Sequence, residues 1–271
     1  MGEQRIMKRA HIGIIGILFF VGVGGGSGRA AEQSESTTRL WKPKAGTSYT
    51  GGLPREIIWL KDGAEMVLVP GGEFLFGKTK ETMRLDSFYM DRFPVTNERY
   101  RKFVQETGHR VPFTKEESAK ALNWRGKTYP KGKAKHPVVL VSWADAMAYC
   151  HWAGKMLPTE EQWEKAARGS DGRAYPWGEE FDEEKCNTLF SGTKGTTPVD
   201  RYPKGASPYG CYDMAGNVWE WTRSRMGTQP VVRGGSFFDG DAEARSSLRV
   251  LSPPNPKCRN IGFRSCWVPG K

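Results

Sequence analysis

Two short segments in the C-terminal part of the chain carry side chains that could do chemistry. The first covers residues 213–220 and contains the carboxylates of Asp213 and Glu220. Glycine and asparagine tolerate the backbone angles of a tight loop, so the carbonyl oxygens of Gly216 and Val218 can turn inward. Hard oxygen ligands from a short loop suit a hard cation. We therefore expect a cation-binding loop here, with a plain turn as the alternative.

The second segment places a hydroxyl close to three carboxylates. It contains Ser236, Asp239, Asp241 and Glu243. A serine nucleophile needs an adjacent base, and no histidine lies near Ser236 in the sequence. Three acidic residues within five positions could supply oxygen ligands to a metal, but they are also ordinary for a loop. We expect a polar loop, and keep a nucleophile or a new metal site at these residues as alternatives.

Other patterns typical of catalysis are missing from the sequence. There is no H-E-x-x-H, no glycine-rich phosphate loop and no G-x-S-x-G. His109, His136 and His151 are not at ligand spacing, so structural roles are expected for them. No C-x-x-C pair occurs among the five cysteines, and their pairing stays open: Cys150, Cys186, Cys211, Cys258 and Cys266.

Three helices with clear start signals must help to position these segments. The sequence predicts them at residues 96–108, 142–154 and 159–169. Thr96 is the expected N-cap of the first, and the second begins with Ser142-x-x-Asp145. The third begins with a Thr159-x-x-Gln162 capping box, and a glycine follows each helix.

Short strands and long loops are expected between these helices. Strands are predicted within residues 65–77, interrupted by a Pro-Gly turn, and at 85–93, 231–238, 248–251 and 262–268. Residues 109–135 have no clear period and are interpreted as a surface insertion. The pattern predicts one loop-rich α+β domain.

The first 30 residues have the pattern of a secretory signal peptide. Arg5, Lys8 and Arg9 precede a short apolar run at residues 12–23, and small residues precede a cleavage position near Ala30. This run is shorter than the roughly 20 apolar residues of a membrane span, although an uncleaved anchor is the alternative. We expect a signal peptide at 1–30, a flexible linker at 31–55 and one domain at 56–271. The predicted location is periplasmic or secreted, with no stable membrane span after cleavage.

Charge and composition narrow the class of partner. The formal net charge is +11, but the basic residues are scattered and follow no nucleic-acid-binding motif. Export makes a nucleic-acid partner still less expected. A basic surface can instead attract an acidic partner or an anionic envelope surface.

Nine segments, in a consistent order, resemble the formylglycine-generating enzyme or sulfatase-modifying factor family. They lie within residues 60–268, at 66–74, 88–97, 136–146, 157–164, 175–178, 197–200, 213–221, 233–236 and 262–264. The resemblance implies a C-type-lectin-like fold with little regular secondary structure. That implication agrees with the loop-rich α+β pattern.

The same resemblance bears on catalysis. Active members of the family carry two cysteines after Gly-Gly-Ser that bind copper and oxidise a cysteine of an unfolded sulfatase to formylglycine. Here Asp239 stands at the first position, Glu243 and Ala244 lie near the second, and no cysteine occurs between residues 211 and 258. Cu(I) prefers soft thiolate ligands, so we expect no copper and no formylglycine-generating activity. Ser236, Asp239, Asp241 and Glu243 lie where the family has its active groove.

The resemblance also implies structural ions and a disulfide. It assigns calcium to Asp213, Gly216, Val218 and Glu220. A second calcium site would use Asn187 and Thr188, although Ser191 stands where a carboxylate is expected. The implied disulfide joins Cys150 and Cys266, but Cys266 is one residue away from the family position.

Taken together, the sequence predicts an exported accessory or maturation factor that acts on another envelope protein or a peptide client. One alternative is an oxidoreductase of altered chemistry, active in the oxidative maturation of a secreted metabolite or protein. The other is a lectin-like ligand-binding module. A stable partner, a redox metal or a small ligand would distinguish the three.

Overall fold

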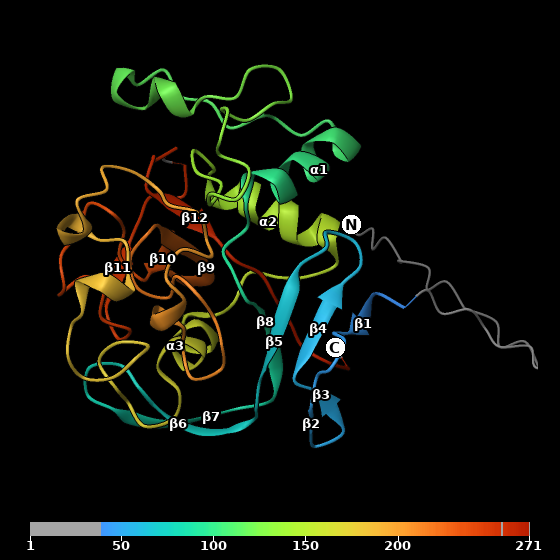
Figure 1. Cartoon of the computed structure of the whole chain (residues 1–271), viewed down its shortest axis with the longest axis vertical. Coiled ribbons are helices and arrows are strands. Elements are labelled where there is room, and N and C mark those ends of the chain that lie inside the picture. Colours follow the sequence, from blue (N-terminus) through green and yellow to red (C-terminus); the bar gives the residue numbers. More distant parts are fainter. Residues whose placement is uncertain (1–38, 256, 271) are drawn as a thin grey trace, which may run out of the picture. The chain divides into compact units, whose positions relative to one another are not determined.

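Two main β-sheets, two two-stranded ribbons and three α-helices are the principal elements of the part of the chain that the computed structural model describes, residues 39–255 and 257–270. One sheet has five strands in the order β1-β4-β5-β8-β13, and the other has four in the order β11-β10-β9-β12. Two ribbons, β2-β3 and β6-β7, have two strands each. Long loops connect these elements (Figure 1). The architecture is the loop-rich, single-domain α+β fold that the sequence predicts.

The three predicted helices are confirmed. They are α1 (Asn97–Thr107), α2 (Trp143–Ala153) and α3 (Glu160–Arg168). Thr96 caps α1, and both α2 and α3 begin with reciprocal capping boxes. Gly108 and Gly154 end α1 and α2 in the left-handed conformation, which glycine adopts without steric cost. The helix limits therefore follow from local side-chain chemistry.

The five-stranded sheet begins earlier in the chain than expected. Its strands are β1 (Trp41–Pro43), β4 (Glu56–Trp59), β5 (Glu65–Val69), β8 (Phe88–Asp91) and β13 (Cys266–Trp267). β1 pairs antiparallel with β4, so residues 41–43 are not the flexible linker predicted for 31–55. The rings of Trp41 and Trp267 lie 6.1 Å apart, and this distant apolar contact holds the otherwise polar segment on the sheet. The expected signal peptide, residues 1–30, and linker residues 31–38 lie outside the described residues.

The four-stranded sheet contains the main difference from the predicted strands. Its members are β9 (Trp219–Met226), β10 (Gln229–Arg233), β11 (Arg249–Leu251) and β12 (Ile261–Phe263). β9 was not predicted, because its sequence lacks a clear alternation. The segment 262–268, expected as one strand, forms β12 and β13 in different sheets. β12 runs parallel to β9, whereas β13 runs antiparallel to β8.

The two ribbons lie outside the main sheets. They are formed by β2 (Tyr49–Thr50) with β3 (Leu53–Pro54), and by β6 (Gly72–Phe76) with β7 (Glu81–Leu85). The predicted Pro-Gly turn does separate β5 from β6. These two strands do not pair with each other, because β5 pairs with β4 and β8. The turn thus redirects the chain from the five-stranded sheet to the β6-β7 hairpin.

The cysteines are unpaired, so the implied disulfide between Cys150 and Cys266 is not formed. Both residues are buried, and the Sγ atom of Cys266 lies 3.7 Å from the side-chain oxygen of Gln162. The one-residue offset explains this orientation, since successive residues of a strand point to opposite faces. Burial raises the pKa of Cys266 to about 12, so this thiol stays protonated.

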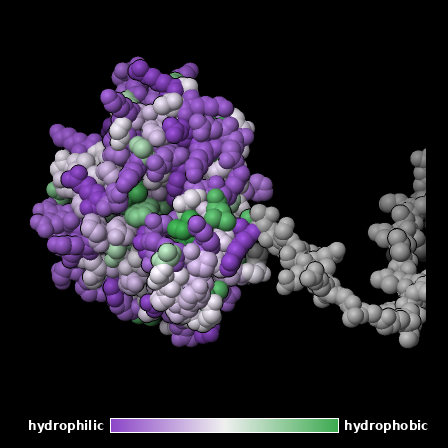
Figure 2. All heavy atoms as spheres, turned by 45° about the vertical axis from the view of Figure 1, so that its right-hand side comes forward, coloured by the Kyte–Doolittle hydropathy of each residue, from purple (hydrophilic) through white to green (hydrophobic). Residues whose placement is uncertain are grey.

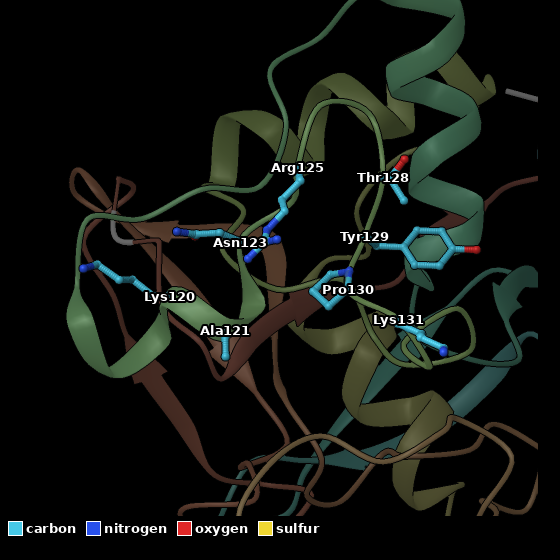
Figure 3. A pocket seen from close by; sticks show the side chains of 8 residues that line it. All are labelled: Lys120, Ala121, Asn123, Arg125, Thr128, Tyr129, Pro130 and Lys131. Atoms are coloured by element: carbon cyan, nitrogen blue, oxygen red, sulfur yellow. The ribbon is translucent and has the colours of Figure 1, made fainter.

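The surface of the described part is predominantly polar. Figure 2 shows one face, on which hydrophilic residues predominate and apolar residues form small patches. One patch lies beside the first described residues. A search of residues 39–255 and 257–270 finds no helix that is long and apolar enough to cross a membrane.

Candidate functional site

The β9-β10 hairpin brings the two chemically interesting segments together. Arg233 of β10 lies opposite Glu220 of β9. Beyond the strand ends, the backbone N–H of Gly216 donates to the carbonyl of Gly234 at 2.7 Å. Gly235 has φ +72°, and a Cβ there would lie 2.9 Å from the carbonyl oxygen of Glu243. Glycine therefore lets the 234–244 loop fold closely back on itself beside the 213–218 loop.

Ser236 and Asp239 form one hydrogen-bonded unit at this place. The buried hydroxyl of Ser236 donates to the Oδ2 atom of Asp239. The indole N–H of Trp219 donates to the same carboxylate oxygen at 2.9 Å. The side-chain amide of Asn260 donates to the Ser236 hydroxyl at 3.1 Å. Asp239 thus occupies the position where the family resemblance places a cysteine, and it closes a four-residue polar network.

Asp241 and Glu243 do not join this network. Asp241 is exposed, and its backbone carbonyl accepts a hydrogen bond from the Tyr175 hydroxyl at 3.2 Å. The carboxylate of Glu243 accepts from the backbone N–H of Gly240 at 3.2 Å, which closes the loop locally. Among the described residues, no cluster of three or more His, Cys, Asp or Glu side chains is arranged to hold a metal ion. Of the four candidates, Ser236 and Asp239 are therefore joined, whereas Asp241 and Glu243 make separate contacts.

The described histidines face other parts of the molecule. His136 lies 2.9 Å from the Thr196 hydroxyl, and His109 lies 2.9 Å from a carboxylate oxygen of Asp145. Burial lowers the pKa of His136 to about 4, with the neighbouring Lys133 ammonium as a smaller cause. Ser236 has a carboxylate and an amide as side-chain partners, and neither geometry resembles a serine–histidine pair.

The residues at this site do not fit a Cu(I) centre. Ala244, near the expected second thiolate position, is buried in an apolar cluster with Tyr175. The carboxylate of Asp239 is a hard ligand and already accepts two hydrogen bonds. Elsewhere, burial raises the pKa of the Cys211 thiol to about 11 and that of Cys186 to about 12. These protonated thiols are part of the core.

In the expected cation loop, Asp213 has a carboxylate without an ion pair among the described residues. It is buried and has φ +53°. Its Oδ2 atom accepts from the Asn217 amide at 2.8 Å, and no ion pair of Asp213 occurs within residues 39–255 and 257–270. Burial raises the pKa of Asp213 to about 7. A buried carboxyl that lacks a direct counter-charge is a favourable place for a cation.

Glu220 has a different environment from Asp213. Its carboxylate forms a two-pronged ion pair with Arg264, with 2.7 Å from Nε to Oε2 and 2.7 Å from Nη2 to Oε1. The indole N–H of Trp163 donates to the same carboxylate at 2.7 Å. All three side chains are fully buried. A calcium ion bound through Glu220 would therefore have to share these oxygens with Arg264.

Asn187 and Thr188 lie directly beside the cation loop. The backbone of Asn187 bridges to Gly216, where a Cβ would lie only 2.4 Å from the Asn187 carbonyl oxygen. The Ser191 hydroxyl is 2.9 Å from the side-chain oxygen of Asn187 and 2.8 Å from the carbonyl of Thr188. A protein hydroxyl thus occupies the space between the two expected ligands. The Thr188 hydroxyl itself is buried without a hydrogen-bond partner.

Two residues that organise the site, Asn217 and Asn260, were not expected from the sequence, and Trp219 was expected in the core or as a wall of the groove. Asn217 joins the loops, because its side chain bonds to Asp213, Thr197 and Asn187. Asn260, which directly precedes β12, and Trp219 of β9 hold the Ser236–Asp239 pair. Their sequence signals are weak, since a polar residue beside a strand and a tryptophan within one are common in any fold.

Comparison with known sequences gives a consistent result. Residues 59–268 match the Sulfatase-modifying factor enzyme 1-like domain. The protein named inactive C-alpha-formylglycine-generating enzyme 2 of Bos taurus is 35% identical over 79% of this chain and 92% of its own. The formylglycine-generating enzyme of Thermomonospora curvata is 32% identical over 75% of this chain and 93% of its own.

Comparison with solved structures confirms the fold. PvdO from Pseudomonas aeruginosa superposes with a TM-score of 0.63 at 22% identity, over 77% of this chain and 95% of that one. CarF superposes with a TM-score of 0.59 at 23% identity, over 75% of this chain and 98% of that one. The shared architecture is the C-type-lectin-like fold expected from the resemblance.

Proposed function

The chain belongs to the sulfatase-modifying factor family, and from this premise we propose that it is an exported accessory or maturation factor without copper-dependent formylglycine-generating activity. Its client would be another protein of the cell envelope, or a peptide segment of one. A relative that carries the word inactive in its name, at 35% identity, supports a role of this kind.

One observation carries the proposal. Asp239, at the position of the first copper cysteine, is tied into a network with Ser236, Trp219 and Asn260. Removing this carboxylate would leave two buried donors without their acceptor, so it has a local structural role. The carboxylate therefore holds the loop in place where the family resemblance puts a copper ligand. A loop ordered by hydrogen bonds and lacking thiolates suits recognition of a client better than copper chemistry.

Phe238 and Arg259, here called the rim, offer groups for recognition beside this loop. Phe238 is partly exposed, and the guanidinium of Arg259 lies 4.2 Å from the centre of its ring. Arg259 also donates to the carbonyl of Ser118 at 3.2 Å, which ties the rim to the 109–135 insertion. An exposed aromatic ring stacked with an arginine is typical of protein-binding surfaces. We assign Phe238 and Arg259 to client contact.

We propose calcium as a structural ion. The carboxylate of Asp213 and the backbone carbonyls of Gly216 and Val218 would hold it, and the bound ion would supply the positive charge that buried Asp213 lacks. Glu220 would not be a dedicated calcium ligand, because its carboxylate is already paired with Arg264. The Asn187 and Thr188 position is a weaker candidate, because Ser191 already bonds to both residues.

The metal content of the purified mature chain, residues 31–271, tests the absence of copper chemistry. Inductively coupled plasma mass spectrometry after incubation with Cu(I) should find no stoichiometric copper. The double variant Asp239→Cys/Ala244→Cys restores two thiols in the same loop and serves as the matched control. Stoichiometric copper or iron in the unmodified protein, or oxygen consumption with a cysteine peptide, would favour the oxidoreductase alternative.

The client is tested in living cells. Cross-linking of the tagged, exported protein should recover one envelope protein reproducibly. Phe238→Ala/Arg259→Ala should abolish this cross-link, while the exposed pair Lys42→Gln/Lys194→Gln should preserve it. A thermal shift with a small sugar or metabolite, without any protein partner, would favour the lectin-like alternative.

A further inference from the structure

A second groove lies on the β6-β7 side of the molecule, lined by residues other than the four-residue polar network around Ser236. It consists of two neighbouring cavities of about 550 and 350 Å³. Both cavities are lined by Lys78, Ser247 and Leu248, so they meet along one depression. We call this depression the hairpin groove; its charged lining residues are Lys78, Lys80, Glu81, Arg168, Glu179, Arg233, Arg245 and Arg249.

Three cations of the hairpin groove have no carboxylate partner. Lys78, Lys80 and Arg245 are exposed, and the described residues provide no ion pair for any of them. The guanidinium of Arg245 lies 5.3 Å from the centre of the Tyr175 ring, which orients it at the groove edge. Unpaired cations around a concave surface focus a positive potential there. The groove is therefore prepared for an anionic partner.

One buried donor of a groove-lining residue remains unused. Arg233 lines the smaller cavity, and its Nε atom has no hydrogen-bond partner, although Nη2 donates to Glu164 and to the Ser246 carbonyl and Nη1 to the Ser247 carbonyl. The hydroxyl of Ser246, which lines neither cavity, is also buried without a partner. Such groups are rare in folded proteins and often mark a place where a water or a ligand binds. The unused Arg233 donor is independent of the exposed lysines and belongs to the same groove lining.

The lining also distinguishes a peptide from other polyanions. Leu248, Ala174 and Ala242 supply apolar surface, while Glu81 and Glu179 place negative charge at the edge. An anionic bilayer or a nucleic acid needs a continuous cationic surface, which Glu81 and Glu179 interrupt, whereas a peptide can place its few carboxylates at the cations alone. A peptide with alternating acidic and apolar side chains can match this mixed lining.

The elements beside the groove favour an extended conformation of that peptide. Arg249 begins β11, which pairs only with β10 and so forms the edge of the four-stranded sheet. The side chains of Val250 and Leu251 are both exposed. An edge strand has free backbone donors and acceptors that an added strand can use.

We propose that the hairpin groove binds an extended acidic segment of a partner protein, with Lys78, Lys80 and Arg245 contacting its carboxylates. The inference rests on the proposed function in one respect: the protein that carries this acidic segment is taken to be the envelope client proposed above. The binding chemistry itself is independent of which protein that is. The groove would thus add a second contact to the one around Phe238 and Arg259.

Fluorescence anisotropy with a labelled peptide in which glutamate alternates with valine tests the proposal directly. The mature chain should bind this peptide, and affinity should fall as the salt concentration rises. The variant Lys78→Gln/Lys80→Gly should weaken binding roughly tenfold, the sum of two exposed charge contacts. Glycine suits position 80 because Lys80 has φ +57°, so the variant should keep its melting temperature.

Controls separate the site from general electrostatics. Lys42→Gln/Lys194→Gln removes the same charge from exposed lysines outside the groove lining and should change the affinity less than twofold. A peptide with glutamine in place of glutamate should bind much more weakly. Equal loss in both lysine variants, no preference for glutamate, or binding of phosphatidylglycerol vesicles without peptide binding would overturn the proposal. Peptide binding without any client cross-link would count against the proposed function alone.

Discussion

At the scale of single residues, the carboxylates of the site divide into architectural and available groups. Glu220 is fully buried, forms an ion pair with Arg264 and accepts a hydrogen bond from Trp163. These interactions connect β9 to α3 and to the residue that follows β12. Asp213, a few residues earlier, is equally buried but has only an amide as its side-chain partner. The two carboxylates of one motif therefore differ in chemistry: Glu220 has an arginine counter-charge, whereas Asp213 has none among the described residues.

Replacing Glu220 tests the architectural role. Glu220→Gln should lower the free energy of unfolding by about 3–5 kcal/mol, because it leaves the buried Arg264 guanidinium without its counter-charge. Urea denaturation followed by tryptophan fluorescence measures this change. Glu184→Gln, at an exposed position, should change the stability by less than about 0.5 kcal/mol. A loss below about 1 kcal/mol at Glu220 would contradict the assigned role.

Replacing Asp213 tests the calcium loop. Calcium at a hundredfold excess over its dissociation constant should stabilise the unmodified protein by about 2.7 kcal/mol, and chelation should reverse this effect. Asp213→Asn should abolish the calcium response, since the amide cannot supply the negative charge. Asp241→Asn should retain the response. Thermal melting at pH 7.5 with calcium or with chelator provides the measurement, and a response lost in Asp241→Asn alone would move the site to the acidic loop.

At the scale of elements, α3 positions the hydrogen-bonding and ionic groups behind the site. It contributes Trp163 to Glu220 and Glu164 to Arg233, and both partners belong to the β9-β10 hairpin. The helix is only nine residues long, so its ends matter for its stability. Its capping box therefore connects a local sequence signal to the position of the sheet.

The capping box of α3 provides a prediction at this scale. Thr159→Ala should destabilise the protein by about 1 kcal/mol, because the backbone N–H of Gln162 loses the hydroxyl that accepts its hydrogen bond. Thr159→Ser keeps an acceptor and should be nearly neutral. Chemical denaturation of the three proteins distinguishes these outcomes. Equal losses for alanine and serine would show that packing of the threonine methyl group dominates.

At the scale of the whole molecule, the stability depends on groups that the fold has removed from water. Burial lowers the pKa of His136 to about 4, whereas an unfolded histidine titrates near 6.5. The unfolded state therefore binds the proton more strongly. The stabilising contribution is complete above about pH 6.5 and is lost as the pH falls toward 4.

A pH series tests this linkage. Between pH 7 and pH 5 the melting temperature of the unmodified protein should decrease relative to that of His136→Gln, while the raised pKa of Asp213 acts in the opposite direction in both proteins. His151→Gln removes an exposed histidine of α2 and should leave the profile unchanged. Superimposable profiles for the unmodified protein and His136→Gln would contradict the prediction. Chelator should be present throughout, so that any calcium effect is kept separate.

Most helices and the family were determined by the sequence alone. Thr96, Ser142 and Thr159 specify the helix starts through their own hydroxyls, so no distant contact is needed. The replacement of the copper cysteines by Asp239 and its neighbours is also visible without coordinates. The fold class follows from the nine ordered motifs, and the comparisons confirm it.

The tertiary structure decided how the polar residues are used. Whether Glu220 binds a metal ion or Arg264 depends on the pairing of β12 with β9, and β12 lies more than forty residues later in the sequence. β1 is ordered because Trp41 meets Trp267 near the other end of the chain, a contact that local composition cannot predict. The hairpin groove likewise combines residues near 78 with residues near 248. Local patterns encode caps and turns, but ion pairing and cavities depend on which distant segments the core brings together.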